Sequence, residues 1–219
     1  MQTYPTPSPV TAVLDIPAGR IRLIAADRAD TTVEVLPADP GSSRDRTAAE
    51  HTTTEYANGT LRVTGPDGRV LGNPGAVEVT VQLPAGSQVQ ATAASAEFRT
   101  VGRLGEVTFD GARASIKVDE AATARLTVSD GTIAVGRLGG DAEISTQRGD
   151  ILLTEATSGT VTLRTQDGSI TAGVAAGISA ALDAGTQLGR ISNALVNAGA
   201  PGLTIHATTS RGDITARSL

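Results

Sequence analysis

Apolar and polar residues alternate along most of this 219-residue chain, in short segments that end at glycine-containing turns. Between Leu126 and Gly173 one arrangement occurs three times: an apolar–polar–apolar triplet, a turn with glycine, one further residue and then an isoleucine. Strict alternation over a few residues is typical of a half-buried β-strand, whereas an amphipathic helix repeats every three to four residues. The pattern therefore predicts short strands joined by tight turns.

This unit recurs through the second half of the chain at a nearly constant spacing. A period of this size is typical of repeat architectures, in which each unit buries its apolar side against its neighbours. We predict an all-β fold: a single-stranded, right-handed β-solenoid that resembles a β-helix, with coils of about 18–23 residues and each isoleucine over the previous one. The residues that follow the turns are Phe98, Ile116, Ile133, Ile151, Ile170, Ile191 and Ile214, in steps of 18, 17, 18, 19, 21 and 23 residues.

One segment of the repeat leaves the type of element open. Asp119–Arg125 contains Ala-Ala-Thr-Ala, which is compatible with a short helix. Small residues also suit the corners of a narrow solenoid, where facing sheets lie only about 10 Å apart. We favour a strand here, and the helix stays the alternative.

The first 76 residues are less regular. Residues 1–9 contain three prolines and are expected to form an extended lead-in. Alternation predicts a strand, a tight turn and a strand over Ala12–Leu23, and a further short strand over Thr31–Leu36. Residues 38–50 are polar and aperiodic, so we expect a surface loop.

Turn signals follow this loop. Asn58-Gly59 lies between two alternating segments and favours a β-hairpin over residues 54–63, because a tight primed turn needs positive φ at both central residues. Gly65–Gly68 and Gly72–Gly75 are expected to be two further turns. Regular coils then occupy residues 77–219, so that residues 1–219 form one predicted domain.

The middle residues of the triplets are expected to form a column on the outside of the solenoid. β-Branched residues are common on exposed strands, so strand propensity alone accounts for this column. A binding role for Thr108, Thr127, Thr162 and Thr204 stays the alternative. The whole column consists of Thr108, Thr127, Glu143, Thr162, Ala181 and Thr204.

The C-terminal coil end is expected to be open, because the chain stops at Leu219 directly after the strand around Ile214–Ala216. An open strand edge exposes unpaired backbone groups and invites association with another strand. Arg211, Asp213 and Arg217 are expected to act as charged residues that oppose such pairing. A homo-oligomer through this coil end is therefore a candidate assembly.

Composition narrows the class of protein. The only aromatic residues are two tyrosines and two phenylalanines, so a narrow aliphatic core is expected. The net charge of −5, without a basic block, argues against nucleic acid as a partner.

No apolar run approaches the ~20 residues of a membrane span, and residues 1–9 lack the features of a signal peptide. There is no cysteine, hence no disulfide or thiolate metal site, and a cytoplasmic protein is expected.

No residue pattern indicates catalysis. His51 and His206 are far apart in the sequence, and a catalytic zinc needs three protein ligands. A phosphate-binding loop, a dinucleotide fingerprint and a Gly-x-Ser-x-Gly motif are all missing. We therefore predict a protein that is not an enzyme, without catalytic, cofactor-binding or metal-binding residues and without a cofactor. The acids fall mainly at turns, as at Asp110, Asp130, Asp150 and Asp167.

Two Arg-Gly-Asp tripeptides, at 148–150 and 211–213, match an integrin-binding sequence. Both occupy the turn position at which Asp130-Gly131 and Asp167-Gly168 also occur. A turn explains all four sequences because glycine adopts φ values that other residues avoid. We interpret the tripeptides as turns.

Two segments and the turns between them resemble a known family. They are Val13–Val35, with Ile-Pro-Ala-Gly-Arg-Ile, and Thr208–Leu219, with Ser-Arg-Gly-Asp-Ile. Over nearly its whole length the chain is similar to the DUF4097 family in its actinobacterial form, β-strand-repeat proteins that carry the label "putative adhesin". The resemblance implies a right-handed β-solenoid of undefined role, with some Gram-positive relatives associated with cell-envelope stress responses. It implies no catalytic residue.

We therefore expect a non-enzymatic scaffold or partner-binding protein that presents a surface to an unknown protein partner. One alternative is a self-assembling structural protein resembling bactofilins, which polymerise through stacked coil ends. The other is a carbohydrate-active enzyme or a surface adhesin. Assembly predicts a mass that rises with concentration unless a charge is placed at Ile214. An enzyme predicts two or more acids in a cleft on one outer sheet face.

Overall fold

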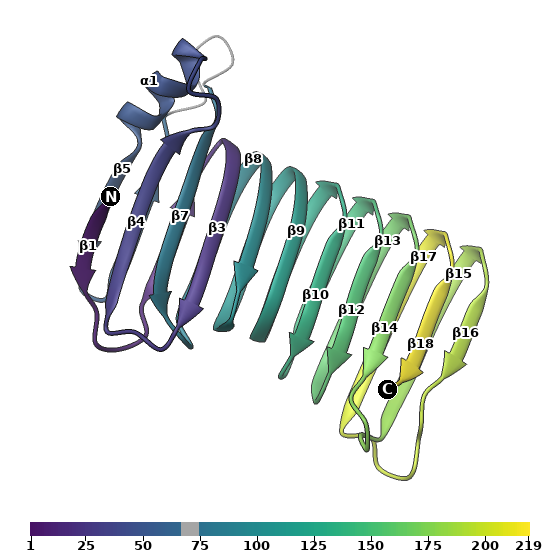
Figure 1. The fold of residues 1–219 in the computed structure, drawn as a ribbon. Coiled ribbons are helices and arrows are strands. Elements are labelled where there is room, and N and C mark those ends of the chain that lie inside the picture. The colour runs from purple at the N-terminus through teal and green to yellow at the C-terminus, as the bar shows by residue number, and fades with distance from the viewer. Residues whose placement is uncertain (67–74) are drawn as a thin grey trace. The chain divides into compact units, whose positions relative to one another are not determined.

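The computed structural model describes residues 1–66 and 75–219 (Figure 1). The two turns expected at Gly65–Gly68 and Gly72–Gly75 lie largely outside the described residues. The chain divides into two compact units, Met1–Ala114 and Ser115–Leu219. The boundary falls inside one long strand, β9 (Arg103–Asp130). The single-domain organisation of the chain stays a prediction.

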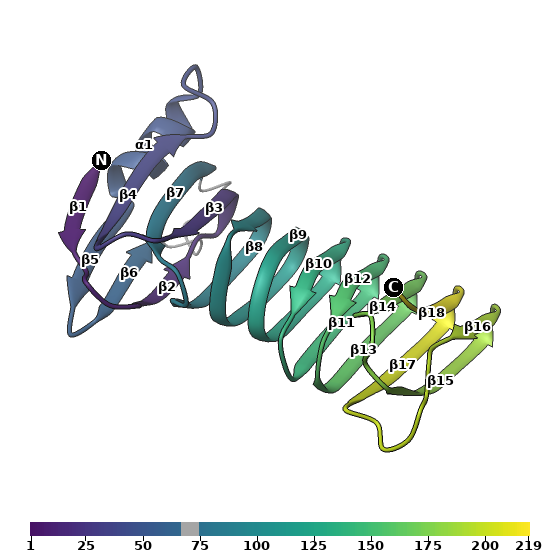
Figure 2. The ribbon, with the colours of Figure 1, turned by 60° about the horizontal axis from the view of Figure 1, so that its bottom comes forward.

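The first unit contains two sheets with β8 (Gln88–Val101) contributing to both. Strands β6 (Thr60–Thr64), β2 (Thr11–Asp15) and β8 pair in parallel, as do β7 (Val77–Pro84), β3 (Ala18–Ala26) and β8. Three further pairs are antiparallel: β5 (Thr53–Ala57) with β6, β4 (Asp30–Pro37) with β7, and β1 (Gln2–Pro5) with β4. One sheet has the order β5, β6, β2, β8 (Figure 2). The other has the order β1, β4, β7, β3, β8 (Figure 1).

Alternating residues of both sheets form one aliphatic core in this unit. Leu14 and Val63 from the first sheet and Leu23 from the second are buried. Phe98 is buried and lies opposite Ile21 in the ladder, and its ring centroid is 5.0 Å from that of Phe109. The expected aliphatic core is confirmed, with one aromatic pair inside it.

The expected hairpin is confirmed, whereas the loop expected before it is wrong. Asn58 and Gly59 have φ values of 51° and 75°, as the primed turn between β5 and β6 requires. The lead-in is extended over Gln2–Pro5, as expected, and there it forms the strand β1 that pairs with β4. The loop expected over residues 38–50 contains a helix, α1 (Ser43–His51), because the Ser42 hydroxyl accepts a 3.3 Å hydrogen bond from the Asp45 N–H and caps it.

The second unit consists of two parallel ladders of strands. β9 begins both ladders, and its segment Asp119–Arg125 is strand, so the helix alternative is wrong. The first ladder continues through β10 (Ile133–Leu138), β12 (Ile151–Ala156), β14 (Ile170–Val174), β18 (Ile214–Ser218) and β16 (Ile191–Ala194). The second continues through β11 (Ala142–Arg148), β13 (Gly159–Asp167), β17 (Leu203–Arg211) and β15 (Ala180–Leu188).

The isoleucines after the turns lie opposite one another along the first ladder, which confirms their predicted stacking within this unit. Their order is Ile116, Ile133, Ile151, Ile170, Ile214 and Ile191. The last two are exchanged relative to the sequence. Ile214 is only 1% exposed, whereas Ile191 is 47% exposed.

This exchange involves a whole coil. β17 and β18 lie between β13/β14 on one side and β15/β16 on the other (Figures 1 and 2). The expectation of an open edge at Ile214–Ala216 is therefore wrong, because β18 is paired on both sides. The outermost strands of this unit are β15 and β16.

Stacked turns connect the two ladders. Each turn glycine lies next to the turn glycine of the adjacent coil, in the order Gly131, Gly149, Gly168, Gly212, Gly189. Threonine hydroxyls inside the unit bind these turns: Thr165 donates to the Gly149 carbonyl and Thr209 to the Gly168 carbonyl, both at 3.0 Å. The turns are thus held by hydrogen bonds from the core side.

Both Arg-Gly-Asp tripeptides are such turns. Arg148 pairs with Asp130 of the neighbouring coil at 3.1 Å, and the Asp150 carboxylate accepts the Ser169 N–H at 2.7 Å. In the second copy, the Asp213 carboxylate accepts the Arg190 N–H at 2.8 Å. The tripeptide side chains therefore link adjacent coils, as a turn role predicts.

Candidate functional site

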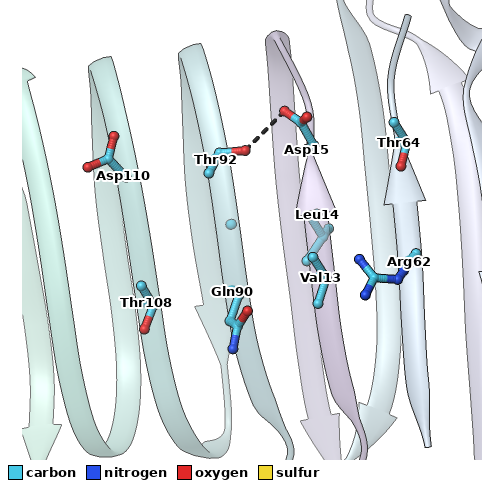
Figure 3. Close-up of a pocket in the computed structure, with 10 residues that line it drawn as sticks. Val13, Leu14, Asp15, Arg62, Thr64, Gln90, Thr92, Thr108 and Asp110 are labelled. Carbon is cyan, nitrogen blue, oxygen red and sulfur yellow. Dashed lines mark hydrogen bonds between the residues drawn. The ribbon is translucent and has the colours of Figure 1, made fainter. Parts of the chain in front are cut away.

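A hollow of about 400 Å³ lies on the outer face of the β6–β2–β8 sheet, together with the adjoining part of β9 (Figure 3). We call it the polar hollow because seven of its ten lining residues are polar or charged. Alternation places it there: Leu14, Val63 and Ala91 face the core, so their sequence neighbours face outward. The outward side chains that line the hollow are Val13, Asp15, Arg62, Thr64, Gln90, Thr92, Thr108 and Asp110. All of them belong to the first unit.

Strand register arranges these side chains in two rows. Val13 lies opposite Arg62 on one side and Gln90 on the other. Asp15 lies opposite Thr64 and Thr92 in the same way. Figure 3 shows Thr108 and Asp110 on the next strand beyond Gln90 and Thr92. Neighbouring strands are about 4.8 Å apart, so each row offers regularly spaced hydrogen-bonding groups.

The hollow contains one cation and two carboxylates, and most of its polar groups are exposed. The Thr92 hydroxyl donates a 3.0 Å hydrogen bond to Asp15. Arg62 faces Glu55 across the β5–β6 pair, outside the hollow. Asp15 and Asp110 both point to solvent from one outer sheet face. This arrangement meets the geometric condition that the enzyme alternative set.

Asp110 is the one acid from the sequence analysis that lines this hollow. The prediction that Asp110 lies at a turn is wrong, because Asp110 lies inside β9 with its side chain outward. Asp150 lies in a turn, and Asp130 and Asp167 end their strands next to turns, as expected.

The histidines lie elsewhere. His51 ends α1 and is exposed, and His206 of β17 lies 3.2 Å from an Asp183 carboxylate oxygen on the adjacent strand β15. Within residues 1–66 and 75–219, no three His, Cys, Asp or Glu side chains come together as a metal site would require.

The expected outer column does not exist as one row. Thr127 lies opposite Ser145, Thr162 lies between Glu143 and His206, and Thr204 lies opposite Thr160 and Ala181. Thr108 belongs to the other unit and lines the hollow. The misplacement is a shift of two residues, which alternation cannot detect because it keeps every side chain on its own face.

The polar hollow could not be predicted from the sequence. Outward polar residues such as Asp15, Arg62 and Gln90 are visible in the alternation, but they meet only because β2 lies between β6 and β8. These three strands are not consecutive in the chain. The sequence therefore indicates which side chains face outward, but it does not indicate which strands lie side by side.

The fold and the outer sheet face described above define a class: an all-β protein that consists mainly of parallel strand ladders with polar outer faces. The profile of the family described as Toastrack DUF4097 matches residues 11–217, and the chain belongs to this family. Among curated proteins, none matches the chain. In the part of the chain that the structure describes, no helix is long and apolar enough to cross a membrane.

Two solved structures have a similar fold. A "putative adhesin" from Parabacteroides distasonis has a TM-score of 0.54 at 10% identity, with 98% of this chain and 95% of that chain covered. Another from Bacteroides fragilis has a TM-score of 0.52 at 14% identity, again with 98% and 95% covered. At these identities the similarity shows the fold alone.

Proposed function

We propose that this protein is a non-enzymatic partner-binding member of its family, and that the polar hollow on the β6–β2–β8–β9 face is its binding surface. The observation that carries the proposal is the hollow itself: eight outward side chains from four neighbouring strands line one concave surface. We further propose that the ladders form right-handed β-solenoid coils, which the in-register parallel pairing supports.

Binding fits this site better than catalysis. A two-carboxylate hydrolase needs one acid that stays protonated, and burial in an apolar pocket is the usual means. Asp15 and Asp110 are exposed, and Asp15 already accepts a hydrogen bond from Thr92. The lining residues include no histidine and no aromatic platform for a sugar ring.

The chemistry of the lining indicates how a partner would be recognised. Threonine hydroxyls and the Gln90 amide supply neutral donors and acceptors, and Arg62 with the two aspartates supplies charges of both signs. Contacts of this kind give specificity and speed association, and they weaken with salt. We infer a protein partner with a polar surface of matching pattern.

A capture experiment with charge-reversed variants tests this function. Immobilised wild-type protein should retain a partner from a lysate of the source cells, and Arg62→Glu should lose it. Arg125→Glu is the matched control, because Arg125 is also an exposed strand arginine opposite a glutamate. Equal retention by both variants would contradict the proposal. Polysaccharide cleavage by the wild type that Asp15→Asn or Asp110→Asn abolishes would favour the enzyme.

Self-assembly is a second candidate, and the outermost strands of the second unit favour it. β15 and β16 each pair on one side only, with β17 and β18. Leu188 and Ile191 are 67% and 47% exposed there, and Val196 in the following loop is 56% exposed. Light scattering after size exclusion should show a mass that climbs with concentration and that Ile191→Lys holds at the monomer. A constant wild-type mass would exclude assembly.

Location and pathway stay predictions. The adhesin name of the structural neighbours would require a position at the cell surface, whereas the sequence analysis expects a cytoplasmic protein. A link to cell-envelope stress rests on the family resemblance. Fractionation of the source cells and a deletion strain under envelope stress test both points.

A further inference from the structure

Strand arginines in this protein regularly lie opposite acids on the next strand. The pattern holds in both units and involves exposed side chains, with N–O distances of 3.1 to 3.9 Å. The pairs are Arg20 with Glu78, Arg125 with Glu143, Arg137 with Glu155, Arg148 with Asp130 and Arg211 with Asp167. Charge complementarity across neighbouring strands thus recurs in these ladders.

Arg164 and Arg217 lie opposite uncharged residues, and one pair in the described ladders places two arginines opposite each other. Arg22 of β3 lies directly opposite Arg99 of β8, and its neighbour on the other side is the uncharged Thr80 of β7. Both arginines are exposed. Within the described residues, neither guanidinium has a carboxylate within ion-pair distance. Like charges opposite each other on neighbouring strands destabilise a sheet, so this pair carries a cost that the other arginines avoid.

The two arginines converge on a small hollow of about 170 Å³, on the outer face of the β7–β3–β8 sheet. Arg20, Ile21, Glu78 and Glu97 complete its lining. The acids belong to the adjacent row: Glu78 pairs with Arg20 at 3.2 Å, and Glu97 lies opposite Arg20. Along this row the nearest acid is Glu34 of β4, which lies beyond Thr80, so Arg22 and Arg99 have no acid directly opposite them on the strands paired with β3.

We propose that Arg22 and Arg99 form a binding site for a phosphate-type oxyanion. A guanidinium presents a planar fork of N–H donors that matches the oxygens of phosphate, and two forks can bind one anion from both sides. The bound anion neutralises the repulsion between the two arginines. This site lies on a different sheet from the polar hollow and is independent of the function proposed above.

Titration of the full-length protein with inorganic phosphate tests this site. At constant ionic strength, held with sodium chloride, the side-chain NMR signals of Arg22 and Arg99 should shift saturably. Arg22→Gln and Arg99→Gln should each weaken phosphate binding about tenfold, since each removes charge-assisted hydrogen bonds. Arg125→Gln should leave the affinity unchanged. Loss of the like-charge repulsion should not unfold either variant, and an unchanged circular dichroism spectrum checks this.

The outcomes are distinct. No saturable shift, or the same affinity in all three variants, would overturn the site. Vesicles of phosphatidic acid and of phosphatidylcholine then distinguish the source of the anion. Binding to the first alone, lost in Arg22→Gln, would assign a lipid headgroup. Phosphate binding without vesicle binding would assign a free anion.

Discussion

Glycine at the turns of the second unit is fixed by two separate constraints. Gly149 has a φ of 137°, a conformation that L-residues with a side chain rarely adopt. A Cβ at Gly149 would also lie 2.1 Å from the carbonyl oxygen of Gly131 in the adjacent coil. The distance is short because the turns of adjacent coils stack directly on one another. Glycine is therefore required here by the stacking of the repeat, and its presence does not indicate an integrin-binding sequence.

Gly149→Ala should therefore lower the free energy of unfolding by about 3 kcal/mol, through backbone strain and the clash with Gly131. Gly185→Ala is the control, since its Cβ would meet nothing within 4 Å. That variant should stay within about 0.5 kcal/mol of wild type. Urea unfolding measures both, and comparable midpoints for the two variants would refute the stacking constraint.

Asp30 carries a pH dependence that follows from its neighbour. The Arg28 Nε lies 2.9 Å from a carboxylate oxygen of Asp30, and this hydrogen bond lowers the pKa of Asp30. A lowered folded-state pKa means that the contact stabilises the fold above the unfolded-state pKa. The contribution is lost as the pH falls through the folded-state pKa of Asp30.

Arg28→Gln should accordingly raise the pKa of Asp30 toward the usual aspartate range. The stability difference between wild type and this variant should shrink on acidification and level off below the folded-state pKa, where only the hydrogen bond from Arg28 to Gln82 still distinguishes them. An NMR titration of the Asp30 carboxyl carbon measures the shift directly. The same pKa in both proteins would show that Arg28 is not its cause.

At the scale of elements, features encoded within a few residues could be predicted from the sequence. The Asn58-Gly59 hairpin and the isoleucine stacking are of this kind, since each depends on one turn and its flanking alternation. The helix after Ser42 was also locally encoded, by the Ser-x-x-Asp cap and by Ala48, which α1 buries. The helix could not be recognised from hydrophobic periodicity, because a short polar helix that buries one alanine has almost no regular spacing of apolar residues.

The order of the last two coils could not be predicted from alternation, because both fit the same repeat. Their inward residues do differ in size: β17 buries Leu203 and Ile205, whereas β15 offers Ala180 and a half-buried Leu182. A coil with a smaller apolar side loses less when one side stays open to water. Apolar volume for each coil is therefore the signal that could have identified the outermost one.

Cysteine pairs test this order in a chain that has no cysteine of its own. Thr171 and Thr215 are direct neighbours across β14 and β18, and so are Ser192 and Thr215 across β16 and β18. Both cysteine pairs should oxidise to disulfides, since direct neighbours lie within bridging distance. A Thr171–Ser192 cysteine pair should stay reduced, and its oxidation would indicate sequential stacking instead.

At the scale of the whole molecule, the sequence predicts a protein that acts through its surface, but it does not predict which part of the surface binds a partner. The all-β class and the family follow from the repeat and from the turns. The polar hollow does not, because its rows form between strands that are distant in the chain, such as β2 and β8. Likewise Arg22 and Arg99 become neighbours only through the β3–β8 pairing.

The binding role of the hollow is tested most directly by a photoreactive amino acid at Gln90, in the centre of its first row, in cells that express the protein. The matched position is Thr127, an exposed outward residue of the second unit. We expect light to produce an adduct with one partner protein at Gln90 and none at Thr127. No adduct at Gln90, or the same adducts at both positions, would contradict a partner surface on this face.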